Sequence, residues 1–476
     1  MSFRTFSGGL PRRFRVVQQS FLQRDGLAFA EVLSEQDIQT AFDTEGVRFA
    51  QEEGDVYTPS VTLWAFLSQA VFKAEHRSCV AAVARVAVLM AALQRRVSPD
   101  TGAYCRARAK LPEVVLERLA MQLADRSEET VPSDWLWHGR HVHLVDGTTL
   151  SGPDSPANQA AWPQPTNQEE GLGFPLIRMV VLLSLATALL TGMAMGPCAG
   201  KETGETALFR SLLKQLLRGD IFVADRYMCS YFMIALAREY GVDAVVRQHQ
   251  QRITDFRRGQ SLGKEDHLAR WWRPARPEWM DVDTYQEMPE FLDVRELRVH
   301  VQQPGFRTEA FVVVTTLTDP KAYSSQEIAS LYHKRWLVEL DIRAIKVSLG
   351  IDVLRCRSPH MVRKEIWTSL LAYNLIRKAI LEAAYAADVS PRELSFTAAM
   401  QAIGAGWTAV LLLDDAGQIR LIDLYLHNLA GYRVGDRPNR IEPRAIKRRP
   451  KPQRLLTKPR DAARRDKSLV AGRRPH

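Results

Sequence analysis

The stretch LYHKRWLVELDIRAIKVSL, residues 331–349, contains neither glycine nor proline and predicts one long helix. At the α-helical step of about 100° per residue, Arg335 lies at about 300° from Tyr332. Glu339 lies at about 340° and Lys346 at about 320° on the same wheel. The four side chains therefore share one stripe of the helix. A solvated amphipathic helix with an Arg335–Glu339 pair at i,i+4 explains such a stripe as well, so the rest of the chain has to decide its role.

Two aspartates upstream offer partners to Glu339. Asp146, in VDGTT, follows the alternating and then apolar run 141–145, and residues 147–149 are predicted to turn the chain. Asp225, in VADRY, follows the apolar run 220–224. Each aspartate alone also fits a turn or a helix N-cap. Strand ends are where α/β sheets gather their ligands, and three carboxylates can hold two divalent ions that attack a phosphodiester.

The elements around these acids predict a mixed α/β sheet. We expect strands at 141–146, 176–184, 188–195, 220–224 and 243–247, with helices at 205–218 and 231–240. Residues 1–130 have helical spacing, with predicted helices at 36–52, 61–72, 79–95 and 112–125. Residues 248–308 are predicted to form a β-rich insertion, and helical patterns return at 361–386 and 396–412. The predicted domains are 1–130 (helical), 131–247 and 309–390 (two parts of one core), 248–308 (insertion) and 391–476 (helices and a basic tail).

Basic residues concentrate at the C-terminus. Residues 432–476 hold 16 Lys/Arg and 4 Asp/Glu, a surplus of 12 positive charges, whereas the whole chain has a net charge of +10. A tail of this composition cannot bury a core and is suited to a polyanion, most simply nucleic acid. A solubilising tail is the alternative. Arg106, Arg108 and Lys110 form a second basic group that is either a phosphate-contacting patch or ordinary surface charge.

Other sequence features argue against a membrane protein, a nucleotide-binding protein and a zinc protein. The five cysteines are scattered, which is typical of a reduced, intracellular protein. The longest apolar run, 179–195, is better explained by two buried strands than by a membrane span. The sequence GPCAGK, residues 196–201, does not fit a phosphate loop, so no nucleotide cofactor is expected. His138, His141 and His143 lack the further ligands that a zinc site needs.

These residues resemble a known family. Tyr332, Arg335, Glu339 and Lys346 have the spacing of the Y-R-E-K signature of the insertion-sequence-four family of DDE transposases. VDGTT, VADRY, TGAYCRARAKLP at 101–112 and EPRAIKRRPK at 442–451 extend the resemblance over nearly the whole chain. It implies a ribonuclease-H-like core, interrupted by a β-rich insertion before the helix that carries the glutamate. The 114-residue separation of Asp225 and Glu339 is consistent with such an insertion.

The resemblance also implies a chemistry. Asp146, Asp225 and Glu339 would hold two Mg²⁺ ions, with Mn²⁺ as a substitute, while Tyr332, Arg335 and Lys346 would contact DNA phosphates. The reaction would be cut-and-paste transposition at terminal inverted repeats, through a DNA hairpin and strand transfer into target DNA. A synaptic homodimer is implied, in the cytoplasm at the bacterial nucleoid.

Two other functions remain open at this point. A catalytically silent relative would occupy transposon ends as an inhibitor, although the three intact acids argue against it. A structure-specific nuclease on the same core would cut DNA without inverted repeats or strand transfer. The tryptophans of the insertion, Trp271, Trp272 and Trp279, are expected to be packing residues, or one of them stacks on an extruded base.

Overall fold

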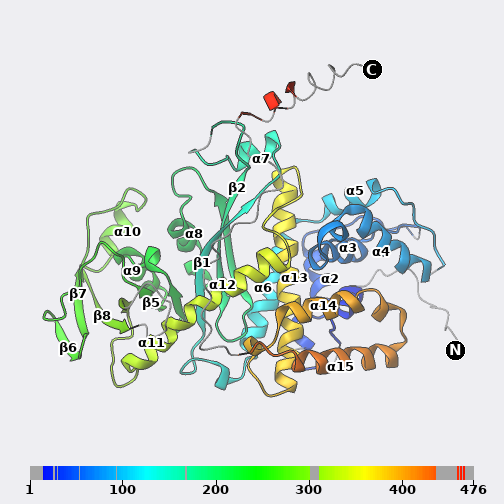
Figure 1. The fold of residues 1–476 in the computed structure, drawn as a ribbon. Coiled ribbons are helices and arrows are strands. Elements are labelled where there is room, and N and C mark those ends of the chain that lie inside the picture. Colours follow the sequence, from blue (N-terminus) through cyan, green and yellow to red (C-terminus); the bar gives the residue numbers. More distant parts are fainter. Residues whose placement is uncertain are drawn as a thin grey trace.

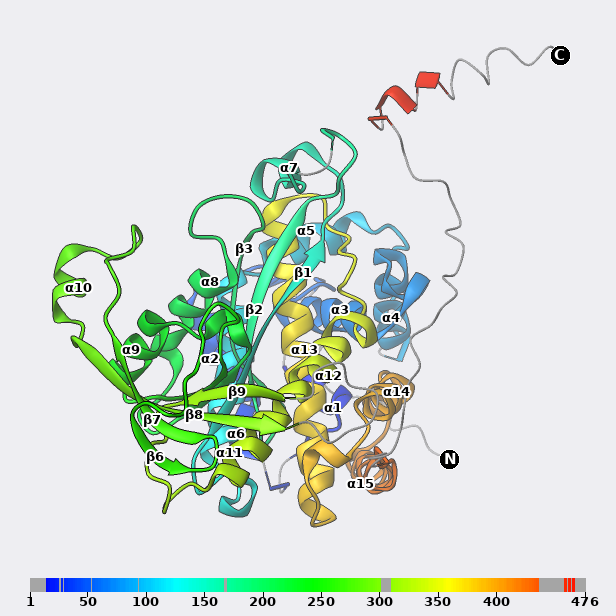
Figure 2. The ribbon, with the colours of Figure 1, turned by 60° about the vertical axis from the view of Figure 1, so that its left-hand side comes forward.

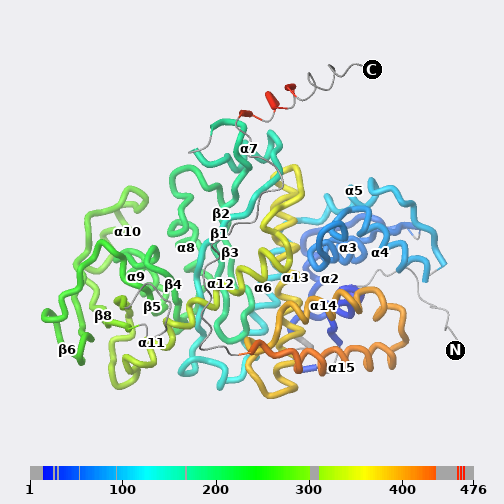
Figure 3. The backbone as a smooth tube through the Cα atoms, viewed as in Figure 1, coloured from blue at the N-terminus to red at the C-terminus, as the bar shows by residue number. Residues whose placement is uncertain are grey.

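The computed structural model describes residues 14–24, 27–28, 30–52, 54–92, 94–166, 169–300, 310–435, 458–459, 461–463 and 465–466. A mixed sheet lies at its centre, and a long helix, α13, separates the sheet from most of the N-terminal helices (Figure 1). The backbone trace shows that the insertion lies at the opposite side of the molecule from those helices (Figure 3). None of the helices in the described ranges is long and apolar enough to cross a membrane.

The sheet has nine strands in the order β3-β2-β1-β4-β5-β9-β8-β7-β6. β1, β2 and β3 are antiparallel neighbours, whereas β4 and β5 run parallel to β1. The strands are β1 (Val142–Ser151), β2 (Leu176–Ser184), β3 (Leu190–Pro197), β4 (Ile221–Ala224), β5 (Asp243–Arg247), β6 (Gln260–Gly263), β7 (Asp266–Trp272), β8 (Phe291–His300) and β9 (Ala310–Thr315). The predicted α/β fold class, a mixed sheet with a β-rich insertion between helical N- and C-terminal regions, is confirmed.

Alternation along the strands gives the sheet two apolar faces. On β2, Met179 and Val181 belong to the hydrophobic core shared with α13, and Val180 and Leu182 belong to a second core on the other face. Helices α8 (Glu205–Leu212) and α9 (Tyr231–Glu239) cover that second face. Burial on both faces explains why β2 is apolar at nearly every position.

Most of the N-terminal helices lie on the far side of α13 from the sheet, whereas the last of them, α6, packs against both α13 and β3 (Figures 1 and 2). The N-terminal helices are α1 (Arg15–Ser20), α2 (Glu35–Thr44), α3 (Pro59–Val71), α4 (Cys79–Ala92), α5 (Gly102–Lys110) and α6 (Glu113–Glu129). The hydroxyl oxygen of Thr58 accepts a hydrogen bond from the Val61 N–H and so caps α3, which starts at a proline as expected. The predicted helix 36–52 was too long, since α2 ends at Thr44.

Helix α13 (Pro359–Ala386) is the spine of the fold. It has 28 residues, and most of them are buried. It contacts α3 and α6 of the N-terminal part and also α14 (Phe396–Gly406) and α15 (Asp415–Gly431). Helix α15 was not predicted from the sequence. The basic segment EPRAIKRRPK at 442–451 lies outside the described residues.

The insertion extends the sheet. Strands β6, β7 and β8 form an antiparallel meander with the short helix α10 (Val282–Glu287) before β8. β8 pairs with β9, which pairs with β5. The predicted turn at Gln303–Gly305 lies outside the described residues.

Residues 325–348 are helical throughout but form no uniform helix, so the single helix predicted for 331–349 is wrong in detail. α11 (Ser325–His333) ends in a 3-10 turn at Lys334–Trp336, α12 (Leu337–Arg343) follows, and Ala344–Ser348 is a π-helical segment. Each change of helix type shifts the angular position of the side chains that follow. The 60° stripe computed for a regular α-helix therefore does not describe this segment.

The turn predicted at residues 147–149 is also wrong. β1 continues to Ser151 because it pairs with β2 along the whole range from His143 to Ser151. The end of β1 then bridges to Val353. Tertiary pairing here overrides the turn preference of an Asp-Gly pair.

Candidate active site

Asp146 and Asp225 lie at the same level on two neighbouring parallel strands. Leu144 of β1 pairs with Val223 of β4, and each aspartate follows its strand's paired residue by two positions. β4 ends at Ala224, whereas β1 continues. Neighbouring strands are about 4.8 Å apart, so the register brings the two carboxylates together where β4 stops.

Backbone N–H groups hold both carboxylates. Asp146 Oδ1 accepts a hydrogen bond of 2.8 Å from the N–H of Gly147. Asp225 Oδ1 accepts one of 2.9 Å from the N–H of Tyr227 and caps the 3-10 turn that follows. Burial raises the pKa of Asp146 to about 6, and the negative charge of Asp225 adds to that rise. The N-cap considered for Asp225 is therefore present, and it does not compete with a place at the site.

Glu339 reaches Asp146 through Arg335. α12 packs on β1. Arg335 Nη2 lies 3.0 Å from Glu339 Oε1, and Arg335 Nη1 lies 3.8 Å from Asp146 Oδ2. The Arg335–Glu339 pair considered for a solvated helix thus exists, but its guanidinium is only 20% exposed and also faces Asp146. The Glu339 side chain is 59% exposed.

The donor set suits a hard divalent cation, although the described part of the chain contains no group of three His, Cys, Asp or Glu placed to hold a metal ion. Asp146, Asp225 and Glu339 offer only carboxylate oxygens, the ligands that Mg²⁺ prefers. The Arg335 guanidinium stands between two of them and supplies positive charge there. Metal binding therefore requires Arg335 and Glu339 to rearrange. The assignment of the three acids as ligands stays a prediction.

A fourth carboxylate, Glu205, stands beside these acids and was not predicted. A Cβ atom built on Gly147 would lie 2.3 Å from the carboxyl carbon of Glu205. Burial raises the pKa of Glu205, Arg178 lowers it and the charge of Asp225 raises it. Glu205 opens α8, where an acidic residue is favoured by the helix dipole. The sequence therefore suggests for Glu205 only a role at the start of a helix. Nothing in the sequence indicates that Glu205 lies next to Gly147.

Tyr332 and Lys346 flank the acids. Tyr332 is 6% exposed, its ring lies 5.2 Å from that of Phe311, and burial raises its pKa to about 12. Lys346 Nζ donates to Thr148 Oγ1 at 3.0 Å and to the carbonyl of Thr149 at 2.8 Å. Lys346 therefore ties the π-helical segment to the part of β1 just past Asp146. Their contact with DNA stays a prediction.

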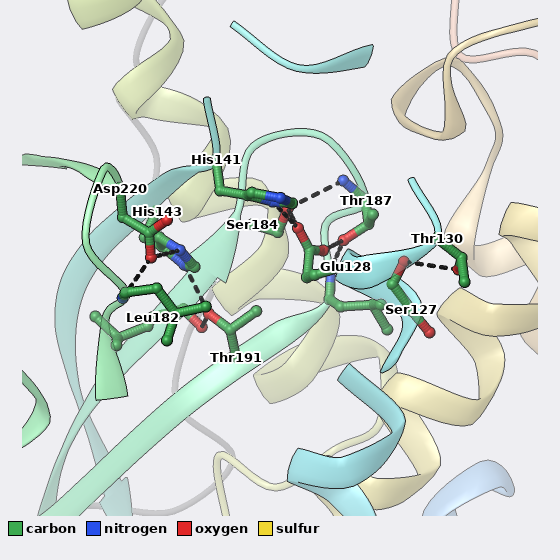
Figure 4. Close-up of polar contacts among 12 residues, drawn as sticks. Ser127, Glu128, Thr130, His141, His143, Leu182, Ser184, Thr187, Thr191 and Asp220 are labelled. Carbon is green, nitrogen blue, oxygen red and sulfur yellow. Dashed lines mark hydrogen bonds and ion pairs between the residues drawn. The ribbon is translucent and has the colours of Figure 1, made fainter. Parts of the chain in front are cut away.

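The three histidines weighed as zinc ligands have three separate carboxylate partners. The pairs are His138–Glu327, His141–Glu128 and His143–Asp220, at 3.1, 3.0 and 3.1 Å. Figure 4 shows that the last two pairs form two distinct polar groups around the start of β1. Glu128 belongs to α6, so its contact with His141 joins that helix to the sheet.

Two of the three tryptophans of the insertion are packing residues. Trp271 is 2% exposed, and its indole N–H donates to Glu296 at 2.7 Å. Trp279 lies under the guanidinium of Arg210, 3.6 Å from the ring centre. Trp272 is 66% exposed. It is the one of the three whose face is open to a base.

Comparison with known proteins gives this site its context. The family described as "Transposase DDE domain" matches residues 137–375, half of the chain. The chain is 25% identical over 403 residues to the transposase InsG of insertion sequence element IS4 from Escherichia coli K12, covering 82% of this chain and 85% of that protein. It is 32% identical over 76 residues to the Escherichia coli transposase of element IS421, covering 16% of this chain and 20% of that protein.

Among solved structures, a piggyBac transposase synaptic complex with hairpin DNA is similar with a TM-score of 0.43 and 10% identity, over 86% of this chain and 84% of that one. This likeness is too weak to support a conclusion. The family match spans Asp146, Asp225 and Glu339 and all five strands of the expected core. The chain belongs to the DDE transposase family, a family of enzymes that cleave DNA and transfer its strands with the help of divalent metal ions.

Proposed function

We propose that this chain cuts DNA at the ends of an insertion sequence and transfers them to target DNA, with Asp146, Asp225 and Glu339 as ligands of two Mg²⁺ ions. The observation that carries the proposal is the register of β1 and β4, which sets Asp146 and Asp225 side by side, with Glu339 joined to Asp146 by one guanidinium. When bound, the metal ions supply an activated water or 3′-hydroxyl and stabilise the leaving oxygen.

The basic side chains complete the site in this proposal. Arg335 neutralises the acids before DNA arrives and then turns to a phosphate, for which its planar fork is well suited. Lys346 extends from the π-helical segment to β1 just past Asp146, where its ammonium group can meet the phosphate next to the scissile bond. Tyr332 is fixed by burial and can donate one hydrogen bond from its hydroxyl.

We propose that the individual reaction steps are those of the DDE transposase family. The first nick frees a 3′-hydroxyl, which attacks the opposite strand to form a hairpin. Hairpin opening and strand transfer then complete cut-and-paste transposition at terminal inverted repeats.

We propose a synaptic homodimer at the nucleoid, with residues 1–130 and the basic tail on the DNA. Removal of residues 440–476 should weaken DNA binding and flatten its salt dependence, and an unchanged salt slope would contradict a role for the tail.

Three isosteric substitutions test the proposal. Asp146→Asn, Asp225→Asn and Glu339→Gln should each abolish Mg²⁺-dependent cleavage of the DNA that flanks the reading frame, while binding to that DNA persists. Asp423→Asn is the matched control, because Asp423 is a half-exposed carboxylate on α15 that pairs with Arg24. Cleavage that survives all three substitutions would exclude these residues as metal ligands.

The products separate this function from the two alternatives. A silent end-binding protein would shift the DNA in a gel and leave it uncut with Mg²⁺. A structure-specific nuclease would cut branched DNA without inverted repeats and would form no strand-transfer product. Nicked and hairpin products at the element ends distinguish the transposase from both.

A further inference from the structure

A second basic site lies away from the carboxylates, between the N-terminal helices and the start of α13. It is a cavity of about 520 Å³, lined by side chains of α3, α5 and α13 and of the loop that precedes α13. A volume of this size is ordinary for a small-ligand pocket. Arg77 and Arg108 line it from the N-terminal part, and Arg355 and Arg357 line it from the loop.

The charge of this cavity is strongly positive. Four arginines line it against one carboxylate, Glu365. That carboxylate is already engaged, because it accepts hydrogen bonds from the backbone N–H groups of Arg355 and Cys356 at 2.9–3.1 Å and lies 3.6 Å from Arg77. Arg355 and Arg357 are exposed, whereas Arg77 is 8% exposed. The site therefore has a buried basic wall and a basic mouth.

Two buried polar atoms in the wall lack a partner. Arg108 Nε and Thr368 Oγ1 are both buried and have no hydrogen-bond partner among the residues that the structure describes. Thr368 as a whole is 1% exposed. Arg108 is held by a hydrogen bond of 3.0 Å from its Nη1 to Gln69 Oε1. A buried donor without an acceptor is destabilising, so two of them in one basic cavity indicate a missing acceptor.

The N-terminus of α13 also favours an anion in this cavity. Ser358 lines the cavity at the N-cap of this 28-residue helix, its side chain makes no capping hydrogen bond, and the first turn carries no acidic residue. The free N–H groups and the dipole of a helix start favour an anion.

The basic side chains of the motif at 101–112 point in two different directions. Arg108 faces the cavity, whereas Arg106 and Lys110 are exposed and do not line it. Residues two apart on a helix point about 200° away from each other. The single phosphate-contacting patch considered from the sequence is therefore two separate surfaces.

We propose that this cavity binds the phosphate group of a nucleotide. The loop that forms its mouth starts next to the active site, since Val353 bridges to Ser151 at the end of β1. A DNA strand that leaves the carboxylates along this loop would bring a backbone phosphate to Arg355 and Arg357. A free nucleotide or phosphate ion offers the same chemistry, and the test separates the two sources. The site does not depend on which residues hold metal.

The test measures binding without Mg²⁺. Inorganic phosphate and 2′-deoxyadenosine 5′-monophosphate are titrated calorimetrically, and a labelled duplex from the flanking DNA is titrated by fluorescence anisotropy. Arg108→Gln and Arg357→Gln should each weaken binding about tenfold, as expected for a charged hydrogen bond, and Thr368→Val about fivefold. Arg420→Gln is the matched control, because Arg420 is an exposed arginine on α15 outside the cavity, and it should change affinity by less than about twofold.

Thr368→Val keeps the proposal testable if Arg108→Gln disturbs folding, because the hydroxyl that it removes bonds to nothing in the described chain. Saturable binding of the free probes that is lost in the cavity variants supports a free nucleotide or phosphate as the source. Failure of the free probes, with weaker duplex binding in the cavity variants alone, supports the DNA backbone. The proposal is overturned if the free probes fail and the duplex responds equally to Arg420→Gln, or to none of the substitutions. Since no cleavage is measured, this failure is distinct from a failure of the carboxylate assignment.

Discussion

Arg335 should oppose metal binding in the absence of DNA and support catalysis in its presence. Its guanidinium lies 3.0 Å from Glu339 and 3.8 Å from Asp146, so it supplies the positive charge that a divalent ion would otherwise supply. We expect Arg335→Gln to raise the affinity of the DNA-free protein for Mn²⁺ and, at the same time, to lower the rate of DNA cleavage.

The size of the expected gain in Mn²⁺ affinity follows from the two ion pairs of Arg335 that a metal ion must displace. The Arg335–Glu339 pair at i,i+4 is worth about 0.3–0.5 kcal/mol because Glu339 is largely exposed. The contact with Asp146, at 3.8 Å and partly buried, is worth a similar or slightly larger amount. The sum is about 1 kcal/mol, and since about 1.4 kcal/mol corresponds to a factor of ten, Mn²⁺ should bind about fivefold more tightly to the variant.

Electron paramagnetic resonance of free Mn²⁺ gives the dissociation constant directly. Arg343→Gln is the control, because Arg343 is an exposed arginine at the end of α12 and its loss changes the net charge equally. Asp146→Asn should remove the binding in both backgrounds. Unchanged or weaker Mn²⁺ binding in Arg335→Gln, or an equal gain in Arg343→Gln, would refute the view that Arg335 holds the place of the ion.

Three further predictions concern the neighbourhood of the site. Gly147→Ala should cost only about 0.5–1.5 kcal/mol, because the added methyl group would lie 2.3 Å from the carboxyl carbon of Glu205, the end of a flexible side chain that has to move aside; in a Glu205→Ala background it should be neutral, and an equal loss of melting temperature in both backgrounds would contradict this. The hydrogen bond to Glu128 raises the pKa of His141, so the stability that this pair contributes is present below the unfolded-state pKa of His and is lost as the pH rises through the raised value. His141→Gln should therefore lower the melting temperature more at pH 6 than at pH 9, and a loss that does not depend on pH would contradict the pairing. Lys346→Met should reduce the slope of log affinity for DNA against log salt by about 0.9, the value for one phosphate contact, whereas an unchanged slope would place Lys346 away from the DNA backbone.

The strands of the core could be predicted because their signals are local. Apolar runs gave the observed bounds of β2 and β5, placed β4 to within one residue and placed β3 to within two. The errors arose where tertiary pairing overrides local preference. The sequence VDGTT has the composition of a turn, yet β2 pairs with it through residue 151 and keeps it extended. The breaks in the helical segment 325–348 coincide with no glycine or proline and could not be predicted from spacing.

The amino-acid sequence by itself determined the type of most elements and singled out the three acids as candidate ligands, because a strand, a helix cap or a family motif depends on residues within a few positions of one another. Only the tertiary structure decided which groups meet. It set Asp146 level with Asp225 through the β1–β4 register, placed Arg335 between Asp146 and Glu339, and brought Glu205 against Gly147. It also turned Arg108 into a basic cavity and left Arg106 outside it. These contacts join residues that are tens to hundreds of positions apart, and their energies depend on burial and distance, which no local pattern contains.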